Sequence, residues 1–360
     1  MSTLPVTKVP PDTRHPMMRQ LDLFSASRVE KSDDDGLDVS YLSKSFCMAG
    51  LPLRKLTERG NGGEECTEFH RRDDRFSLSI NTTSLMLPGN GKRISVGLPF
   101  GPRARLLILW MTTSARNQRR DSGDRWLEIG KIDSWMEQLG TVSSHSHVQA
   151  VKDQLVRLSF AQFTMVLRKE GLDLFRSDKL IDSTIFQQED LERYADGDLS
   201  RVRFPLGVEL SENAFRRFSS DDVVPVSTEA LRSVATSAMA IDILVYLHYR
   251  LPFIGQGESE LVSWRRLAAQ FGSNEPKSRF RQLFDGAIIK ALEAYKGGAN
   301  VDITDEGLIL RYSPVDVRKL FAVNPTRKGD APLLRVRRDT RVVTARIDIA
   351  SVVAIKGKTA

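Results

Sequence analysis

The chain has 360 residues, of which 41% are hydrophobic, so it is long enough to form two ordinary hydrophobic cores. Its 53 basic and 46 acidic residues give a formal net charge of +7, which favours a polyanionic partner, either nucleic acid or an acidic membrane surface. The sequence has no apolar run of about 20 residues that could cross a bilayer, and its two cysteines give no disulfide framework. These features predict a soluble intracellular protein.

The first part of the chain shows little hydrophobic periodicity. Residues 1–75 are rich in Pro, Gly, Ser and mixed charges, as in SDDDGLD at 32–38 and RGNGGEE at 59–65. Such a segment buries too little apolar surface to offset the entropy lost on ordering. Residues 1–75 are therefore predicted to form a mostly disordered N-terminal arm.

Regular patterns begin at residue 76 and continue to about residue 218. Residues 75–87 alternate as a half-buried strand does, and RARLLILWMTTSA at 103–115 reads as a buried helix. A short amphipathic helix, KIDSWMEQL, is followed by HSHVQAVKDQLVRL, for which Ser143 or Ser144 can serve as the N-cap. Two β-like stretches, 160–168 and 202–210, then enclose a long excursion. This order of helices and strands predicts a winged-helix domain over residues 76–218.

The same order returns between residues 219 and 325. The long helix is IDILVYLHYRL, in which VYLHY stands where LWMTT stood, and SWRRLAAQFG echoes the earlier helix that ends in Gln, an apolar residue and Gly. A third helix, 278–295, is followed by VDITDEGLILRY, which reads as a hairpin wing. The residues of the third helix predicted to face inward are Phe280, Leu283, Phe284, Ala287, Ile288, Ala291 and Leu292. The fold class predicted is α+β and helix-rich, with two tandem winged-helix domains and a basic C-terminal tail at 326–360.

In a helix-turn-helix unit, the helix after the turn lies in the major groove and needs polar or cationic side chains opposite its apolar face. Arg, Gln and Asn can form paired hydrogen bonds with base edges. The alternative for each set is an ordinary solvated face, and the helix of the first unit could instead pack against a partner subunit. The candidates in the second unit are Asn274, Lys277, Ser278, Arg279, Arg281 and Gln282, and those in the first are Ser144, His145, Gln149 and Lys152.

The basic C-terminal tail contains a cluster of cations, among them Arg335, Arg337 and Arg338. Their alternation is typical of a strand with a basic edge, or of an arm that follows phosphates. A solvated tail is the equal alternative. Contacts of this kind would strengthen binding to all DNA sequences alike.

Chemical functions find weaker support in the sequence. The His145-Ser146-His147 triplet is similar to the paired metal ligands of rolling-circle nucleases, but it opens a predicted helix, where residues two apart point in different directions. Neither GNGK nor the terminal GKT completes a Walker A motif. The protein is therefore expected to act by binding, without catalysis, cofactor or metal.

Three segments carry a resemblance to a known family: LPFGPRARLLILWMTTSA, SAMAIDILVYLHYRL and VSWRRLAAQFG. They resemble the RepA family of plasmid-encoded replication initiators over roughly residues 98–323. The resemblance implies a bacterial cytoplasmic initiator that binds repeated double-stranded sites at an origin, helps open the duplex and recruits host proteins, namely a helicase or its loader and the host initiator. It also implies self-association through the first domain, as a homodimer in equilibrium with monomer, and no membrane contact. A winged-helix transcriptional repressor without an initiation role is the alternative.

Overall fold

A computed structural model describes residues 39–58, 63–73, 76–88, 91–121, 124–139, 141–169, 172–187, 189–272, 277–295, 298–313, 334–338 and 341–345. All of them lie in one compact unit, Leu37–Ala360. The fold of this unit is α+β, with helices and several small sheets. None of the helices in these ranges is both long and apolar enough to cross a membrane.

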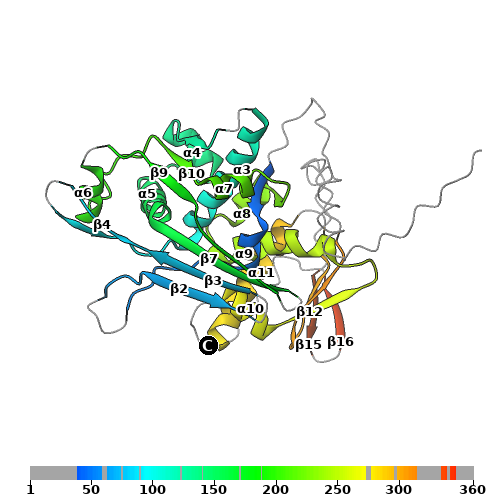
Figure 1. The fold of residues 1–360 in the computed structure, drawn as a ribbon. Coiled ribbons are helices and arrows are strands. Elements are labelled where there is room, and N and C mark those ends of the chain that lie inside the picture. The colour runs from blue at the N-terminus through cyan, green and yellow to red at the C-terminus, as the bar shows by residue number, and fades with distance from the viewer. Residues whose placement is uncertain are drawn as a thin grey trace, which may run out of the picture. The chain divides into compact units, whose positions relative to one another are not determined.

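A four-stranded antiparallel sheet, in the order β2-β3-β7-β8, brings together strands from distant parts of the chain (Figure 1). Buried and half-buried residues alternate along β3, as expected for a strand with one face on the core: Phe76, Leu78 and Ile80 are buried, while the residues between them are half-buried. This confirms the strand predicted after residue 75. The strands are β2 (Glu68–Arg72), β3 (Phe76–Thr82), β7 (Ala161–Lys169) and β8 (Leu172–Lys179).

The first repeat consists of three helices and a small sheet in the order β6-β10-β9. All three predicted helices are present. The two predicted β-like stretches lie in different sheets, because β7 joins the four-stranded sheet and β10 pairs with β9 and β6. The elements are α3 (Gly101–Asp121), β6 (Trp126–Glu128), α4 (Ile132–Gln138), α5 (His145–Phe160), β9 (Ile181–Thr184) and β10 (Gly207–Leu210).

The second repeat has the same order of elements, and its sheet runs β12-β14-β13, which matches β6-β10-β9 position by position. Two further strands extend this sheet beyond β13. The repeat in the sequence is therefore a repeat of topology. The elements are α9 (Ala238–Arg250), β12 (Ser259–Ser263), α10 (Trp264–Phe271), α11 (Lys277–Ala294), β13 (Val301–Ile303), β14 (Gly307–Arg311), β15 (Leu334–Arg338) and β16 (Arg341–Ala345).

Shorter elements complete the unit. Strand β1 pairs with β11, and β4 forms a hairpin with β5. These elements are β1 (Val39–Ser43), α2 (Lys44–Met48), β4 (Ser84–Met86), β5 (Arg93–Ser95), α6 (Asp190–Ala195), α7 (Glu212–Phe218), β11 (Val223–Ser227), α8 (Thr228–Val234) and the 3₁₀ turn η1 (Leu251–Phe253).

The repeated motif of Gln, an apolar residue and Gly ends α10 for a steric reason. A Cβ atom on Gly272 would lie 2.3 Å from the carbonyl oxygen of Ala268, which no other residue could accommodate without a backbone shift. The φ of Gly272 is −66°, so close approach, and not a left-handed conformation, requires glycine here. Its counterpart Gly140 lies outside the described residues.

Two findings bear on the expected domain organisation. The expected disordered arm, 1–75, includes β1, α2 and β2, and Phe46 and Cys47 of α2 are 5% and 1% exposed. Residues 1–38 lie outside the described residues. One continuous buried cluster also contains Leu107 of the first repeat and Phe284 of the second, so no separation of cores occurs at the expected boundary between residues 218 and 219. The ordered elements within residues 1–75 were not predicted, because their apolar residues are buried by strands distant in the sequence and show no local periodicity.

Candidate nucleic-acid interface

Helix α11 is held by its apolar face. The face packs against α9 and α8, and Phe284, which is fully buried, meets Trp264 of α10 edge-on at a ring distance of 5.4 Å. Such aromatic contacts stabilise the packing beyond the burial of apolar surface, and they fix the angle between the helices. The prediction of an inward face is therefore confirmed for six residues: Phe280, Phe284, Ala287, Ile288, Ala291 and Leu292.

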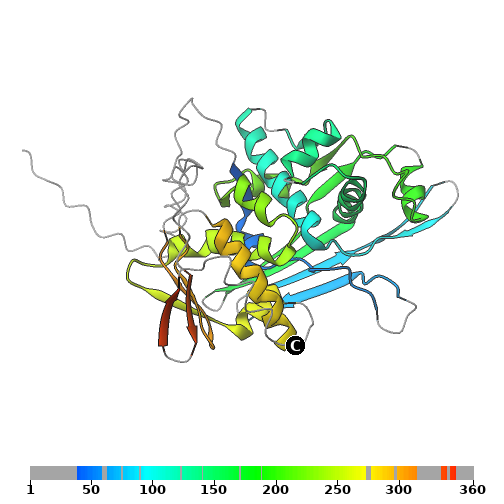
Figure 2. The ribbon, with the colours of Figure 1, turned by 180° about the vertical axis from the view of Figure 1, so that it is seen from behind.

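The opposite side of α11 is exposed along its length. Its residues recur three or four positions apart, as neighbours on one helix face do. Figure 2 shows the helix, drawn in orange, at the front of the molecule. We call this surface the outer stripe; its residues are Arg279, Gln282, Leu283, Gly286, Lys290 and Glu293.

Leu283 was predicted to face inward, and this was wrong. Its exposed fraction is 44%, because it lies on the outer stripe between Gln282 and Gly286. The apolar pattern of α11 is wide enough to suggest one more buried position than the neighbouring helices cover. Lys290 and Gly286 were missed altogether, although counting in steps of three and four from Arg279 would have placed both on the exposed side.

The predicted contact residues of the second unit do not all lie on the outer stripe. Arg279 and Gln282 do, whereas Arg281 lies on the flank of α11 that faces α10. The guanidinium of Arg281 stacks on the ring of Trp264 at 3.6 Å from its centroid, and its Nε donates to Asp285 at 3.1 Å. Arg281 thus already has two intramolecular partners. Asn274 lies outside the described residues, and Lys277 and Ser278 form the first turn of α11 without described side chains.

Trp264 links the helix pair to the hairpin that follows. Its indole Nε1–H donates to the carbonyl oxygen of Thr304, at the turn between β13 and β14, at 3.0 Å. Arg281, Trp264 and Thr304 therefore connect α11, α10 and the hairpin in one chain of contacts. This arrangement fixes the direction in which the outer stripe points.

Helix α5, the counterpart of α11 in the first repeat, has a more covered polar side. Ser144 caps the helix by accepting a hydrogen bond from the His147 amide at 3.4 Å, as predicted. Lys152 donates to the carbonyl oxygen of Val202 and lies 5.3 Å from the ring centroid of Phe204. Burial lowers the pKa of Lys152, while Asp190 opposes this shift. Of the predicted contact residues here, only His145 is fully exposed, and Ser144, Gln149 and Lys152 are half-buried.

The two histidines of the HSH triplet have separate partners. His145 Nε2 lies 2.9 Å from the amide nitrogen of Gln149, and His147 Nδ1 lies 3.2 Å from the carbonyl oxygen of Val142. Within the ranges that the structure describes, no group of three or more His, Cys, Asp or Glu side chains could hold a metal ion. The triplet is used here to begin a helix.

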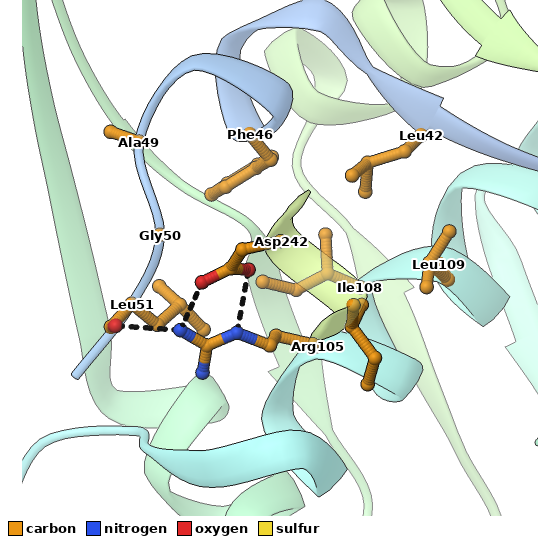
Figure 3. A pocket seen from close by; sticks show the side chains of 10 residues that line it. Leu42, Phe46, Ala49, Gly50, Leu51, Arg105, Ile108, Leu109 and Asp242 are labelled. Carbon is orange, nitrogen blue, oxygen red and sulfur yellow. Dashed lines mark hydrogen bonds and ion pairs between the residues drawn. The ribbon is translucent and has the colours of Figure 1, made fainter. Parts of the chain in front are cut away.

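A buried ion pair joins the first helices of the two repeats (Figure 3). Arg105 of α3 donates from Nε and Nη2 to the two carboxylate oxygens of Asp242 in α9, each at 2.7 Å. The two side chains are 5% and 6% exposed. The remaining guanidinium donors reach the carbonyl oxygens of Leu51, Pro52 and Gly101 at 2.7 to 3.2 Å. The pair is therefore fully hydrogen-bonded, which is the condition for a stable buried charge.

Residue 50 completes this joint. A Cβ on Gly50 would lie 2.1 Å from Oδ2 of Asp242, so only glycine lets the N-terminal segment cross here. The segment 49–51 and the two long helices thus meet at one point, and the geometry between the repeats is set by contacts in a common core.

The cationic residues of the C-terminal tail lie partly in regular structure. Arg335, Arg337 and Arg338 belong to β15, which pairs in parallel with β13 and antiparallel with β16. A strand at this place was one of the two forms expected. Apart from β15 and β16, the tail lies outside the described residues.

Comparison with known proteins finds one family model that matches part of the chain. Residues 98–266 match the model described as "Plasmid encoded RepA protein". The predicted resemblance is confirmed. The match begins at the LPFGPRARLL segment and ends within α10, so α11 lies beyond it.

Two solved structures are similar at low identity, and no curated protein matches the chain. A crystal structure of domains 2-3 of RctB is 13% identical, with a TM-score of 0.39, and the alignment covers 69% of this chain and 82% of that one. A selenomethionine crystal structure of domains 2 and 3 of RctB is 11% identical, with a TM-score of 0.40, covering 72% of this chain and 88% of that one. Scores of this size do not establish a common fold.

Proposed function

We propose that the protein is a plasmid replication initiator that binds repeated duplex sites at an origin, helps open the duplex and recruits host replication proteins. The observation that carries this proposal is the match of residues 98–266 to the plasmid-encoded RepA family. The net charge of +7 supports a polyanionic partner.

The second repeat supplies the DNA contact in this proposal. It acts as a winged helix whose α11 enters the major groove with the outer stripe facing the bases. The stripe offers the right chemistry, since Arg279 and Gln282 can pair with base edges and Lys290 can meet a phosphate. The contacts of Trp264 with Arg281 and Thr304 hold the stripe rigid, which favours selective binding.

The first repeat supplies self-association, as a homodimer in equilibrium with monomer. Strand β8 lies at the edge of the four-stranded sheet, and its Leu172, Leu174 and Phe175 are 75%, 50% and 64% exposed. An edge strand with exposed apolar side chains can pair with a second copy. Phe175→Lys should shift the protein to monomer in sedimentation, while the unfolding midpoint stays unchanged.

The protein acts by binding and not by covalent catalysis in this proposal. The partners of His145 and His147 draw the two imidazoles to different residues, which supports a structural role for both. Incubation with supercoiled origin DNA and Mg²⁺ or Mn²⁺ should yield no nicked circles. Nicking that disappears in a His145→Ala variant would contradict this part of the proposal.

The test of the whole proposal is footprinting on the DNA next to the gene, combined with a replication assay. Regularly spaced protections, and replication of a plasmid that carries the gene and those repeats in a host that cannot replicate the bare plasmid, are expected. One protected palindrome without replication would indicate the repressor instead. Arg279→Ala should lose specific affinity, whereas Arg201→Ala, which removes an equal charge from a side chain that is 79% exposed elsewhere, should not.

A further inference from the structure

The outer stripe contains a glycine that no contact within the described part of the chain requires. Gly286 lies in the interior of α11, and a Cβ atom built on it would have no neighbour within 4 Å. It does not have a left-handed φ. A glycine in a helix interior destabilises it by about 0.5–1 kcal/mol relative to alanine. The open space suggests that another surface approaches the helix backbone closely at this point.

One turn before Gly286, the stripe presents an aliphatic side chain. Leu283 is 44% exposed and lies three residues from Gly286, so the two are neighbours on the same face. Cationic side chains stand at either end of this pair, four residues before Leu283 at Arg279 and four after Gly286 at Lys290. A single exposed leucine needs no explanation, but this one lies between two cations on a surface whose other side chains are polar or charged, with Glu293 at its C-terminal end.

The partner of such a surface must be anionic at its rims and must offer an apolar group between them. The major groove of duplex DNA meets both conditions, because phosphates line it and the 5-methyl group of thymine is the apolar group among its base edges. An aliphatic side chain cannot hydrogen-bond to any base. Thymine is therefore the base that Leu283 can favour.

Resting on the proposed function, we infer that Leu283 contacts the 5-methyl group of a thymine in each DNA site, and that the missing side chain at Gly286 lets the helix backbone lie close enough for this contact. Gln282 and Arg279 then face the neighbouring base edges. Leu283 is in this reading a specificity residue and not part of the core.

The experiment removes one methyl group at a time. Within the footprinted site, each thymine is replaced singly by deoxyuridine, and affinities of the full-length protein are measured at constant salt. At one position per site, the replacement should weaken wild-type binding about fourfold, the effect of losing one buried methyl group. Leu283→Ala should weaken binding to the normal site by a similar factor and show no further loss at that position.

Leu261→Ala provides a matched control, because Leu261 is 45% exposed in the same repeat but lies on β12. This variant should keep the wild-type response to deoxyuridine. Gly286→Ala gives an independent measurement: its thermal midpoint should be equal or higher, since alanine favours the helix, while specific affinity falls roughly tenfold through overpacking.

The outcomes separate the two proposals. Specific binding by wild-type protein that responds to no thymine methyl group, or a Leu283→Ala variant that keeps the full response, overturns the assignment of Leu283 alone. Unchanged affinity of Gly286→Ala overturns the close approach. Absence of specific protection anywhere on the DNA overturns both this inference and the initiator proposal.

Discussion

The two repeats share one topology but present different surfaces. In the first, the chain between α5 and β9 forms the strands β7 and β8 of a larger sheet, whereas in the second α11 leads almost directly into β13. The first repeat also has a long connection between β9 and β10, whose residues 202–204 cover Lys152. The exposure of the third helix therefore depends on what is inserted after it, and not on the repeat itself.

Buried polar residues show the same difference. In α5, Arg157 and Gln154 are only 5% and 3% exposed, and Arg157 is bound by Glu65 and Asp153. The described buried positions of α11 are, by contrast, all hydrophobic. The third helix of the first repeat holds the N-terminal segment, while the outer stripe of α11 is exposed.

The largest predicted effect concerns the joint between the repeats. Asp242→Ala should lower the free energy of unfolding by about 3–5 kcal/mol, because it leaves the Arg105 guanidinium buried without its counter-charge. Urea unfolding measures this change. The double variant Arg105→Met, Asp242→Leu should lose much less, since neither charge remains. A cost below about 1 kcal/mol for Asp242→Ala would mean that the repeats are not joined at this pair.

A second prediction uses equivalent positions in the long helices. His248 of α9 and Thr112 of α3 are both buried, and each bonds the carbonyl oxygen four residues earlier, at 2.9 and 2.8 Å. Only the histidine titrates. Burial lowers the pKa of His248 from 6.5 to about 4, so its neutral form is favoured in the folded protein.

The unfolded chain binds a proton on His248 more readily than the folded protein does. The contribution of neutral His248 to the free energy of unfolding is therefore complete above pH 6.5 and is lost as the pH falls to about 4, a change of roughly 3 kcal/mol. His248→Thr should lower stability at pH 7 and remove that part of the pH dependence, so the difference between the two proteins' urea curves should shrink as the pH falls to 4. An unchanged difference between pH 7 and pH 4 would place His248 in contact with solvent.

Local patterns in the sequence were sufficient to predict many of the helices and strands of this fold. The helices of both repeats, the strand after residue 75 and the last hairpin follow from periodicity, and Ser144 caps its helix as expected. The partners of β7 could not be predicted, because a strand's pattern shows which residues are buried but not which strand covers them. The same reason explains the buried N-terminal segment, whose β1 pairs with β11 about 180 residues away.

The candidate interface was predictable only in part. Arg279 and Gln282 lie on the outer stripe as their helical positions indicate, but Arg281, two residues from Arg279, stacks on Trp264. Sequence periodicity gives the direction of a side chain to within a helix face. Whether a neighbouring aromatic ring captures it depends on the packing of α10 against α11, which the sequence of α11 does not contain.

A third prediction separates Arg281 from the outer stripe. Arg281→Ala should cost about 1 kcal/mol of stability, because it removes a stacking contact and a largely solvent-screened ion pair with Asp285. Lys290→Ala, on the exposed stripe, should change stability by less than about 0.5 kcal/mol. The salt dependence of DNA affinity should show the opposite order of effects. Lys290→Ala should lower the slope of log affinity against log salt by about one phosphate contact, more than Arg281→Ala does. Equal stability losses would show that the stack on Trp264 contributes nothing.

The smallest expected effect is the one that most directly sharpens the contrast between the faces of α11. Leu283→Ala should change the free energy of unfolding by less than about 0.5 kcal/mol, because the side chain is 44% exposed and leaves no cavity. Leu292→Ala, the same substitution at a position that is 4% exposed on the same helix, should cost about 2–5 kcal/mol. Both values come from chemical unfolding monitored by circular dichroism. If the two variants lose equal stability, Leu283 belongs to the core, and α11 then has no leucine available for a partner. If they differ as expected, the second repeat keeps an aliphatic side chain in water on the outer stripe between Arg279 and Lys290, while the equivalent helix of the first repeat has that side occupied by its own chain.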